Sequence, residues 1–255
     1  MKYERSFSGL LQFGLVALMV FFLMQHTLAH ASAEQDISQR VNRILDGSGT
    51  VESVTKLPYF DDLYEVVVQE PGSKRILYSN RSGSHVLLGS LVDSRTMSNL
   101  TSERITKLNR IDFEKDLKPE LALKTVHGTG QRKVAVFEDP RCTYCKKLRQ
   151  TAIETLQDAT VYTYVYPILG PTSIGMAGMV LCAQNPSKMW NAWMLDNVTP
   201  QGDVDCSPPI QQLVDLGASL GITSTPTIIF EDGTRTSGAI KPSEFHRRVT
   251  QAERR

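Results

Sequence analysis

Apolar residues in the first third of the chain follow two different periodicities. One set recurs at helical spacing and predicts a short amphipathic helix over 37–45. Its members are Ile37, Val41, Ile44 and Leu45. After this stretch, alternating and β-branched residues predict four strands, at 51–57, 63–68, 75–79 and 85–91. One helix and four short strands, separated by turn-like segments, indicate a small α+β domain.

The hydrophobic pattern of residues 100–117 predicts a second helix, which Pro119 ends. Its apolar positions, with charged residues between them, are Ile105, Leu108, Ile111 and Phe113. At ~1.5 Å per residue such a helix would be about 27 Å long. We therefore expect a linker helix at 94–118, between a small N-terminal domain at 32–93 and a second domain at 119–255. This helix either holds the two domains apart or packs flat on the second one.

Residues 1–31 have the features of a secretory signal peptide. Two basic residues precede the apolar run 10–24, and small-x-small cleavage sites end at Ala31 and Ala33. A retained membrane anchor is the alternative, but a run of 15 apolar residues is short of the ~20 that span a bilayer. We therefore expect an exported protein, in a compartment where disulfides persist.

Composition excludes some classes of function. The 255 residues include 28 Lys and Arg against 27 Asp and Glu, and removal of 1–31 leaves 26 of each. Such a balance provides no long-range field for nucleic acid or an acidic substrate. Four cysteines are too few for a small disulfide-stapled scaffold, so any disulfide has a particular role.

The candidate chemistry is in the sequence Cys142-Thr-Tyr-Cys145. An apolar run at 133–137 is typical of a buried strand, and good helix formers follow at 146–153. Cys142 is therefore expected at the start of a helix, where unpaired N–H groups and the helix dipole stabilise a thiolate. Cys145 falls one turn later, within reach for a reversible disulfide.

The same spacing also serves zinc, which needs two more ligands to complete a tetrahedron. Cys182 and Cys206 form no second Cys-x-x-Cys, and no His-x3-5-His follows. A purely structural Cys-x-x-Cys disulfide would be a poor staple because it closes almost no loop. The context favours redox chemistry over both alternatives.

The motif Phe137-Glu-Asp-Pro-Arg-Cys-Thr-Tyr-Cys-Lys-Lys-Leu148, together with Thr225-Pro226, resembles the thioredoxin-fold disulfide-bond proteins. More narrowly, the chain is similar to the periplasmic DsbC/DsbG group of disulfide isomerases. This resemblance implies an α+β N-terminal dimerisation domain of cystatin-like type, a linker helix and a thioredoxin-like catalytic domain with a helical insertion. It also implies a periplasmic homodimer that acts on misfolded, disulfide-containing exported proteins.

The resemblance also implies roles for individual residues. Cys142 would be the nucleophile and Cys145 the resolving thiol, while Cys182 and Cys206 would form a structural disulfide. Substrate contacts would come from Tyr144, from Thr225 and from a cis-proline at Pro226. No cofactor or metal is implied, and a DsbD-like inner-membrane reductase would supply electrons.

Three functions remain open. The first is a disulfide isomerase or reductase that is kept reduced. The second is a net dithiol oxidase, or a DsbG-like reductase of sulfenic acids on single cysteines. The third is a non-enzymatic chaperone, in which the thiols are incidental.

The chain also departs from the patterns that it resembles. Thioredoxin has a buried acid six residues before its first active-site cysteine, whereas this chain has Val136 there. Glu138 and Asp139 lie closer to the loop, and we expect them to be exposed. Trp190 and Trp193, on a predicted helix of the insertion, are expected in the core.

Overall fold

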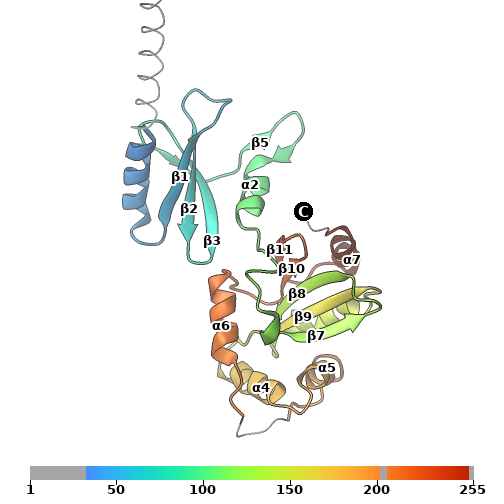
Figure 1. Cartoon of the computed structure of the whole chain (residues 1–255). Helices are drawn as coiled ribbons and strands as arrows, with labels where there is room; N and C mark the ends of the chain where they lie inside the picture. The colour runs from blue at the N-terminus through green and yellow to red at the C-terminus, as the bar shows by residue number, and fades with distance from the viewer. Residues whose placement is uncertain (1–32, 202–205, 253–255) are drawn as a thin grey trace, which may run out of the picture. The chain divides into compact units, whose positions relative to one another are not determined.

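The computed structural model describes residues 33–201 and 206–252, so the predicted signal peptide at 1–31 lies outside the described residues. The chain divides into two compact units (Figure 1). Apart from Pro71–Ser73, the first unit runs to Thr101 and the second begins at Ser102. None of the helices in the described ranges has the length and apolar character that crossing a bilayer requires.

The first unit is one helix, at 33–45, on a four-stranded sheet in the order β1-β2-β3-β4. The strands are β1 (Thr50–Lys56), β2 (Tyr64–Glu70), β3 (Ser73–Ser79) and β4 (Val86–Leu87). The buried face of the helix packs on the sheet, and this core contains Ile37, Val41, Leu45, Tyr64, Val66, Val68 and Leu77. One helix and four strands were predicted from the periodicities, and this prediction is confirmed.

The fourth strand is much shorter than the predicted 85–91, because β4 has only two residues, which pair with the end of β3. Beyond it the backbone finds other partners. Leu91 N donates to Thr101 Oγ1 (2.7 Å), and Leu91 O accepts from Leu100 N (2.9 Å). The chain then forms a small hairpin of β5 (Val92–Asp93) and β6 (Ser98–Asn99).

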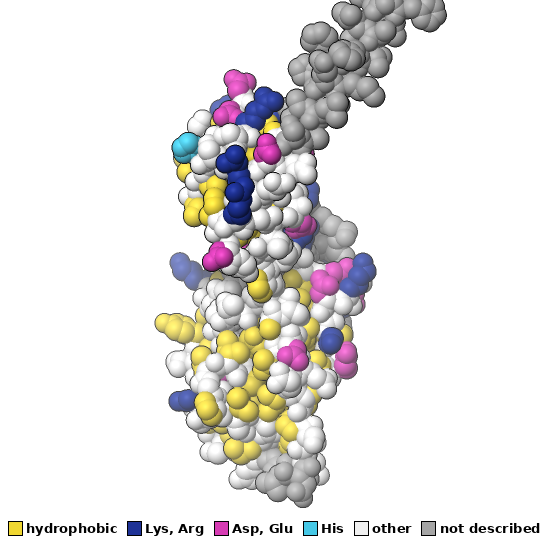
Figure 2. Space-filling view, turned by 90° about the vertical axis from the view of Figure 1, so that its left-hand side faces the viewer, with side chains coloured by type: hydrophobic (Ala, Val, Ile, Leu, Met, Phe, Trp, Pro, Cys, Tyr) yellow, Lys and Arg dark blue, Asp and Glu magenta, His cyan; other side chains and the backbone are white. Residues whose placement is uncertain are grey.

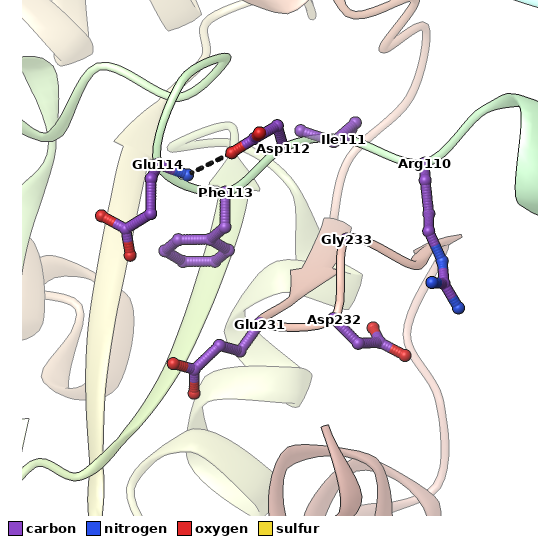
Figure 3. Close-up of a pocket in the computed structure, with 8 residues that line it drawn as sticks. All are labelled: Arg110, Ile111, Asp112, Phe113, Glu114, Glu231, Asp232 and Gly233. Carbon is purple, nitrogen blue, oxygen red and sulfur yellow. Dashed lines mark hydrogen bonds between the residues drawn. The ribbon is translucent and has the colours of Figure 1, made fainter. Parts of the chain in front are cut away.

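The prediction of a linker helix over 94–118 is wrong in extent, because α2 covers only Leu100–Leu108. The chain then extends, and Ile111 N donates to Gly233 O (2.9 Å). The Asp112 carboxylate accepts from the backbone N–H groups of Glu114 and Lys115, at 3.1 Å each, and so forms a turn beside the loop that contains Gly233 (Figure 3). Ile105 and Leu108 of the pattern lie on α2 and are partly buried, whereas Ile111 and Phe113 lie beyond the helix and are buried in the core of the second unit.

The second unit is built on a five-stranded sheet in the order β11-β10-β8-β9-β7. Its strands are β7 (Leu123–His127), β8 (Arg132–Glu138), β9 (Ala159–Val165), β10 (Thr227–Phe230) and β11 (Arg235–Ser237), and η1 (Pro119–Leu121) precedes β7. β8 and β9 are parallel, and the other neighbours are antiparallel. The central strand β8 therefore ends between strands on both sides, directly before the Cys-x-x-Cys motif.

Successive residues of β8 contribute to opposite faces of this sheet, as a strand requires. Val134 and Val136 pack under α3 (Thr143–Leu148), η2 (Arg149–Ile153) and α7 (Pro242–Gln251). Ala135 and Phe137 pack on the other face with α6 (Ile210–Ser219) and the segment from Ile111 to Leu121. Both faces are covered, which explains the uninterrupted apolar run over residues 134–137 of β8.

Two helices between β9 and α6 form the expected helical insertion, α4 (Pro171–Leu181) and α5 (Pro186–Asp196). Trp190 and Met194 of α5 are buried, and Trp193 is partly buried, in agreement with a core role for this segment. The same apolar cluster contains Cys142 and Cys145. The insertion therefore packs directly against the candidate redox pair.

Candidate active site

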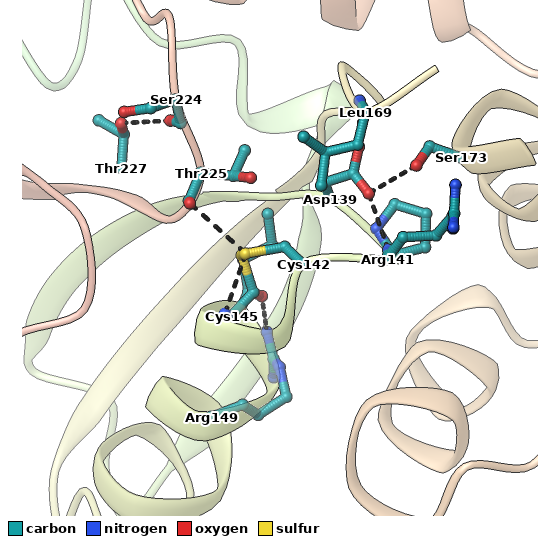
Figure 4. Close-up of a disulfide and its surroundings, with 12 residues drawn as sticks. Asp139, Arg141, Cys142, Cys145, Arg149, Leu169, Ser173, Ser224, Thr225 and Thr227 are labelled. Carbon is teal, nitrogen blue, oxygen red and sulfur yellow. Dashed lines mark hydrogen bonds and ion pairs between the residues drawn. A yellow bond between two sulfur atoms is a disulfide. The ribbon is translucent and has the colours of Figure 1, made fainter. Parts of the chain in front are cut away.

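Cys142 is the N-cap residue of α3 and forms a disulfide with Cys145, with a Cα–Cα distance of 5.2 Å (Figure 4). The backbone N–H of Cys145 donates to Cys142 Sγ (3.1 Å). Cys142 is 5% exposed and Cys145 is fully buried. Cys142 is therefore the more accessible sulfur, as its place at the start of the helix predicts.

A second segment, distant in sequence, faces this disulfide. The Thr225–Pro226 peptide bond is cis, and Thr225 O lies 3.4 Å from Cys142 Sγ. Thr227 Oγ1 donates to Ser224 O (2.7 Å), which holds the turn into β10. The fold therefore brings Thr225 and Pro226 to the cysteine pair, whereas the Tyr144 side chain projects into solvent and is 67% exposed.

Asp139 is fully buried, which corrects the expectation that it is exposed. Its Oδ1 accepts from Arg141 N and Ser173 Oγ, each at 2.7 Å, and its Oδ2 accepts from Leu169 N (2.9 Å). These three donors replace the hydration that the carboxylate loses on burial. Asp139 therefore ties the loop before Cys142 to the start of α4 (Figure 4).

Glu138 is fully buried as well, so the expectation of an exposed side chain is wrong here too. Its Oε2 accepts from Arg149, which is also fully buried, and from Trp190 Nε1 (3.3 Å). Burial raises the pKa of the Glu138 carboxyl, an effect that Arg149 and the Trp190 indole oppose. Position 136 is a valine and not an acid, but the buried acid Glu138 lies two residues further along β8, closer to the cysteines.

Strand alternation was the signal that could have placed Glu138, because it puts this residue on the same face as Val134 and Val136. The expectation of exposure instead followed the rule that acidic residues near loops are usually hydrated. The partner, Arg149, follows Leu148 on the buried side of the helix, where a cation needs a counter-charge.

Lys146 is another residue whose position the sequence does not reveal. Its Nζ lies 3.6 Å from the centroid of the Trp193 ring and donates to Trp193 O (3.2 Å) and Asn197 Oδ1 (2.6 Å). Burial lowers the pKa of Lys146. Trp193 Nε1 in turn donates to Pro140 O (2.6 Å), so both the motif helix and the loop before it are attached to α5.

The other two cysteines form the second disulfide, Cys182–Cys206, with a Cα–Cα distance of 5.7 Å and a sequence separation of 24. Cys182 caps the C-terminus of α4, and Cys206 lies in the segment before α6. This disulfide therefore belongs to the insertion. Within the ranges that the structure describes, no group of three or more His, Cys, Asp or Glu side chains could hold a metal ion.

A disulfide at a helix start, opposite a cis-proline on a mixed five-stranded sheet, defines the thioredoxin-like class. Residues 119–253 match the family model of a thioredoxin-like domain. Residues 28–102 match the model of the disulfide bond isomerase protein N-terminal domain. The chain belongs to the DsbC family of thiol:disulfide interchange proteins.

Individual relatives agree with this assignment. A probable thiol:disulfide interchange protein DsbC of Bordetella avium is 42% identical over 176 residues, 69% of this chain and 62% of the relative. The corresponding Bordetella pertussis protein is 39% identical over 199 residues, 78% of this chain and 68% of the relative. The chain thus spans about three fifths of the length of the first relative. A disulfide interchange protein from Neisseria gonorrhoeae has a crystal structure that is 32% identical, covers 55% of this chain and 100% of its own, and superposes with a TM-score of 0.51.

Proposed function

We propose that this protein catalyses thiol–disulfide interchange in exported proteins, with Cys142 as the attacking sulfur. The observation that carries the proposal is the position of Cys142 Sγ, which caps α3, is the more exposed of the pair and faces Thr225 O. In the reduced protein, the Cys145 N–H that points at this sulfur would stabilise a thiolate.

The reaction conserves atoms and electrons. The Cys142 thiolate attacks one sulfur of a wrong substrate disulfide, so that a mixed disulfide forms and the other substrate sulfur leaves as a thiolate. In isomerisation, a substrate thiolate then displaces Cys142, which is regenerated with no net oxidation. In reduction, the Cys145 thiolate attacks Cys142 instead, so the substrate leaves as a dithiol and the protein is left with the Cys142–Cys145 disulfide.

Both routes begin with the reduced pair, so an electron donor must return the disulfide to the dithiol. We assign this role to a DsbD-like inner-membrane reductase. The transferred pair of electrons passes from a dithiol of the donor to Cys142–Cys145 by the same exchange chemistry.

Substrate would be held beside Cys142 by Thr225, Pro226 and Tyr144. Apolar side chains gather on the face of the second unit that Figure 2 shows. The exposed large apolar residues of this unit include Tyr144, Leu169, Ile174 and Met179. Exposed apolar surface next to a redox pair is suited to unfolded segments, which display the apolar residues that a folded protein buries.

The remaining assignments follow from family membership. We assign residues 1–31 to a cleaved signal peptide, and the site of action to the periplasm. The domain at 32–93 would form a homodimer, the segment 94–118 would link the domains, and the domain at 119–255 would carry the catalysis. A dimer presents two cysteine pairs to one substrate.

The test is recovery of scrambled ribonuclease activity by the reduced protein. We expect wild type to restore activity and Cys142→Ser to fall to the uncatalysed rate. Cys145→Ser is expected to accumulate mixed disulfides with substrate, because the resolving thiol is missing. The matched control is Cys182→Ala/Cys206→Ala, which also removes two sulfurs but is expected to keep the activity.

Two outcomes would contradict the proposal. Failure to reshuffle ribonuclease, together with rapid oxidation of a reduced dithiol peptide, would indicate a net oxidase. Full activity of Cys142→Ser would indicate a chaperone whose thiols are incidental.

A further inference from the structure

A buried polar network lies under the motif helix and takes no part in the exchange described above. Glu138 contacts Arg149 and accepts from Trp190 Nε1. Arg149 also donates to Thr163 Oγ1 (2.8 Å) and to Asn191 Oδ1 (3.2 Å). The network joins β8, η2, β9 and α5, so it connects the central sheet, the motif helix and the insertion.

Stability does not explain why a charged pair occupies this place. A buried ion pair recovers its desolvation cost only when its hydrogen-bonding capacity is filled, and apolar side chains of similar volume often serve as well. Here two atoms of the pair are buried without any hydrogen-bond partner in the described part of the chain, namely Glu138 Oε1 and Arg149 Nε. A network that is incompletely satisfied suggests a role other than holding the core together.

The position of the pair points to the cysteines. The backbone N–H of Arg149 donates to Cys145 O, one turn after the resolving cysteine. Trp190, which donates to Glu138, belongs to the same buried cluster as Cys142 and Cys145. Glu138 itself ends the strand from which the motif loop departs. The Glu138–Arg149 pair is therefore connected to the cysteine pair by one backbone hydrogen bond and by the packed Trp190 ring.

We propose that Glu138 is a positioning residue of the redox site: its carboxylate neutralises Arg149 and thereby limits how readily Cys142 ionises. The inference rests on the proposed role of Cys142 as the attacking sulfur. With the pair intact, the two opposite charges nearly cancel at Cys142. Without the carboxylate, Arg149 keeps its charge, because a guanidinium does not lose its proton in proteins, and this cation stabilises the thiolate.

The size of the effect follows from Coulomb's law. A unit charge at ~10 Å, with an effective dielectric constant of ~20, changes the thiolate-to-thiol ratio about tenfold. The same stabilisation favours the reduced pair over the disulfide by about tenfold, because only the reduced pair carries the thiolate. Loss of the Glu138 charge should therefore make the protein a stronger oxidant.

Other charged groups near the cysteines stay constant in the comparison. Asp139 lies in the motif loop with its hydrogen bonds to the chain around α4, and Lys146 is held at Trp193. Glu154 Oε1 lies 3.7 Å from Arg149 NH1. None of them is altered in the variants below, so a change in Cys142 ionisation is assigned to the pair.

The experiment is a double-mutant cycle on the full protein. The pH dependence of Cys142 alkylation and the redox equilibrium with glutathione are measured for wild type, Glu138→Gln, Arg149→Met and the double variant. In Glu138→Gln, Cys142 is expected to ionise about tenfold more readily at a pH below the wild-type midpoint. The Cys142–Cys145 pair is expected to be more reduced by a similar factor. Adding Arg149→Met is expected to return both values to near wild type, since the double variant has neither charge.

Arg149→Met alone provides an independent arm. Burial raises the pKa of Glu138, and loss of Arg149 removes the main opposing effect, so the carboxyl is expected to bind a proton and stay neutral. Cys142 should then ionise no more readily than in wild type. This arm remains decisive if Glu138→Gln does not fold, because easier ionisation of Cys142 in Arg149→Met would overturn the proposal.

Thr163→Val is the matched control, because it removes one hydrogen bond from Arg149 without changing any charge. If the network is merely structural, Thr163→Val should shift the pH dependence of Cys142 alkylation as Glu138→Gln does. The proposal predicts no such shift. The proposal would also be overturned if Cys142 ionised as in wild type in Glu138→Gln, or if its ionisation stayed shifted in the double variant. Mass spectrometry of the alkylated sulfur separates this failure from that of the proposed function, since alkylation of Cys145 in place of Cys142 would contradict the latter alone.

Discussion

The Cys142–Cys145 disulfide spans a sequence separation of 3 at the start of a helix, whereas Cys182–Cys206 spans 24 residues within the insertion. The first is enclosed by Thr225, the insertion and the motif loop, and its Cys145 is fully buried. The second joins a helix end to an exposed segment. We expect one bond type to serve two purposes in a single unit.

The entropy of the unfolded chain explains why the two disulfides are suited to different roles. Closing the longer loop limits the unfolded chain and contributes about 3.5 kcal/mol in the chain-entropy model, against about 2 kcal/mol for the Cys-x-x-Cys loop. Opening the shorter disulfide is therefore expected to cost the fold less stability than opening the longer one. A disulfide that must open repeatedly is best placed where the fold does not depend on it.

The largest expected difference is in ease of reduction. In a graded glutathione buffer, we expect Cys142–Cys145 to be reduced while Cys182–Cys206 stays intact, with equilibrium constants that differ by about a hundredfold or more. Alkylation of freed thiols followed by mass spectrometry measures both in one sample. Parallel reduction of the two disulfides would contradict the division of roles.

Loss of the longer disulfide should be visible in stability. Cys182→Ala/Cys206→Ala is expected to lower the free energy of unfolding by about 3.5 kcal/mol, because the unfolded chain regains its freedom. Denaturant unfolding of the oxidised proteins measures this loss. Cys142→Ala/Cys145→Ala is the paired comparison, and an equal or larger loss in that variant would argue against the entropic account.

The loop before Cys142 depends on Asp139. Asp139→Ala leaves the partly buried N–H groups of Arg141 and Leu169 and the buried Ser173 hydroxyl without their acceptor, and we expect it to cost about 3 kcal/mol of unfolding free energy. Asp158→Ala serves as control, since the Asp158 carboxylate accepts from Thr129 Oγ1 and Gln131 N at the surface and its loss should cost less. Equal losses in the two variants would show that the Asp139 contacts do not stabilise the loop.

The smallest expected effect concerns Lys146, whose ammonium attaches the motif helix to α5. Lys146→Met is expected to lower the free energy of unfolding by about 1 kcal/mol, through loss of the cation–π contact with Trp193 and of the hydrogen bonds to Trp193 O and Asn197 Oδ1. Lys147→Met removes the same charge from the neighbouring exposed position and should have little effect. Similar values for both variants would mean that the contact with Trp193 adds nothing.

Much of the architecture could be read from local pattern. The helix and strands of the first unit, the strand before Cys142 and the helix after it all follow hydrophobic periodicity and turn residues. The expected length of the linker helix is wrong because Ile111 and Phe113 continue a helical spacing, yet they lie in a non-helical segment and are buried in the core of the second unit. Periodicity indicates which residues are buried, whereas contacts with the neighbouring core decide which backbone conformation those residues adopt.

The sequence by itself determined the candidate chemistry, because two cysteines at this spacing before helix formers place Cys142 at a helix start with Cys145 within disulfide reach. The tertiary structure decided what surrounds that disulfide. Thr225 lies 83 residues from Cys142, and the partners of Asp139 and Glu138 come from the insertion and from a helix that turns Arg149 inward. Strand alternation indicates the buried face for Glu138, but the donors that make burial of either carboxylate possible come from parts of the chain that no local pattern brings together.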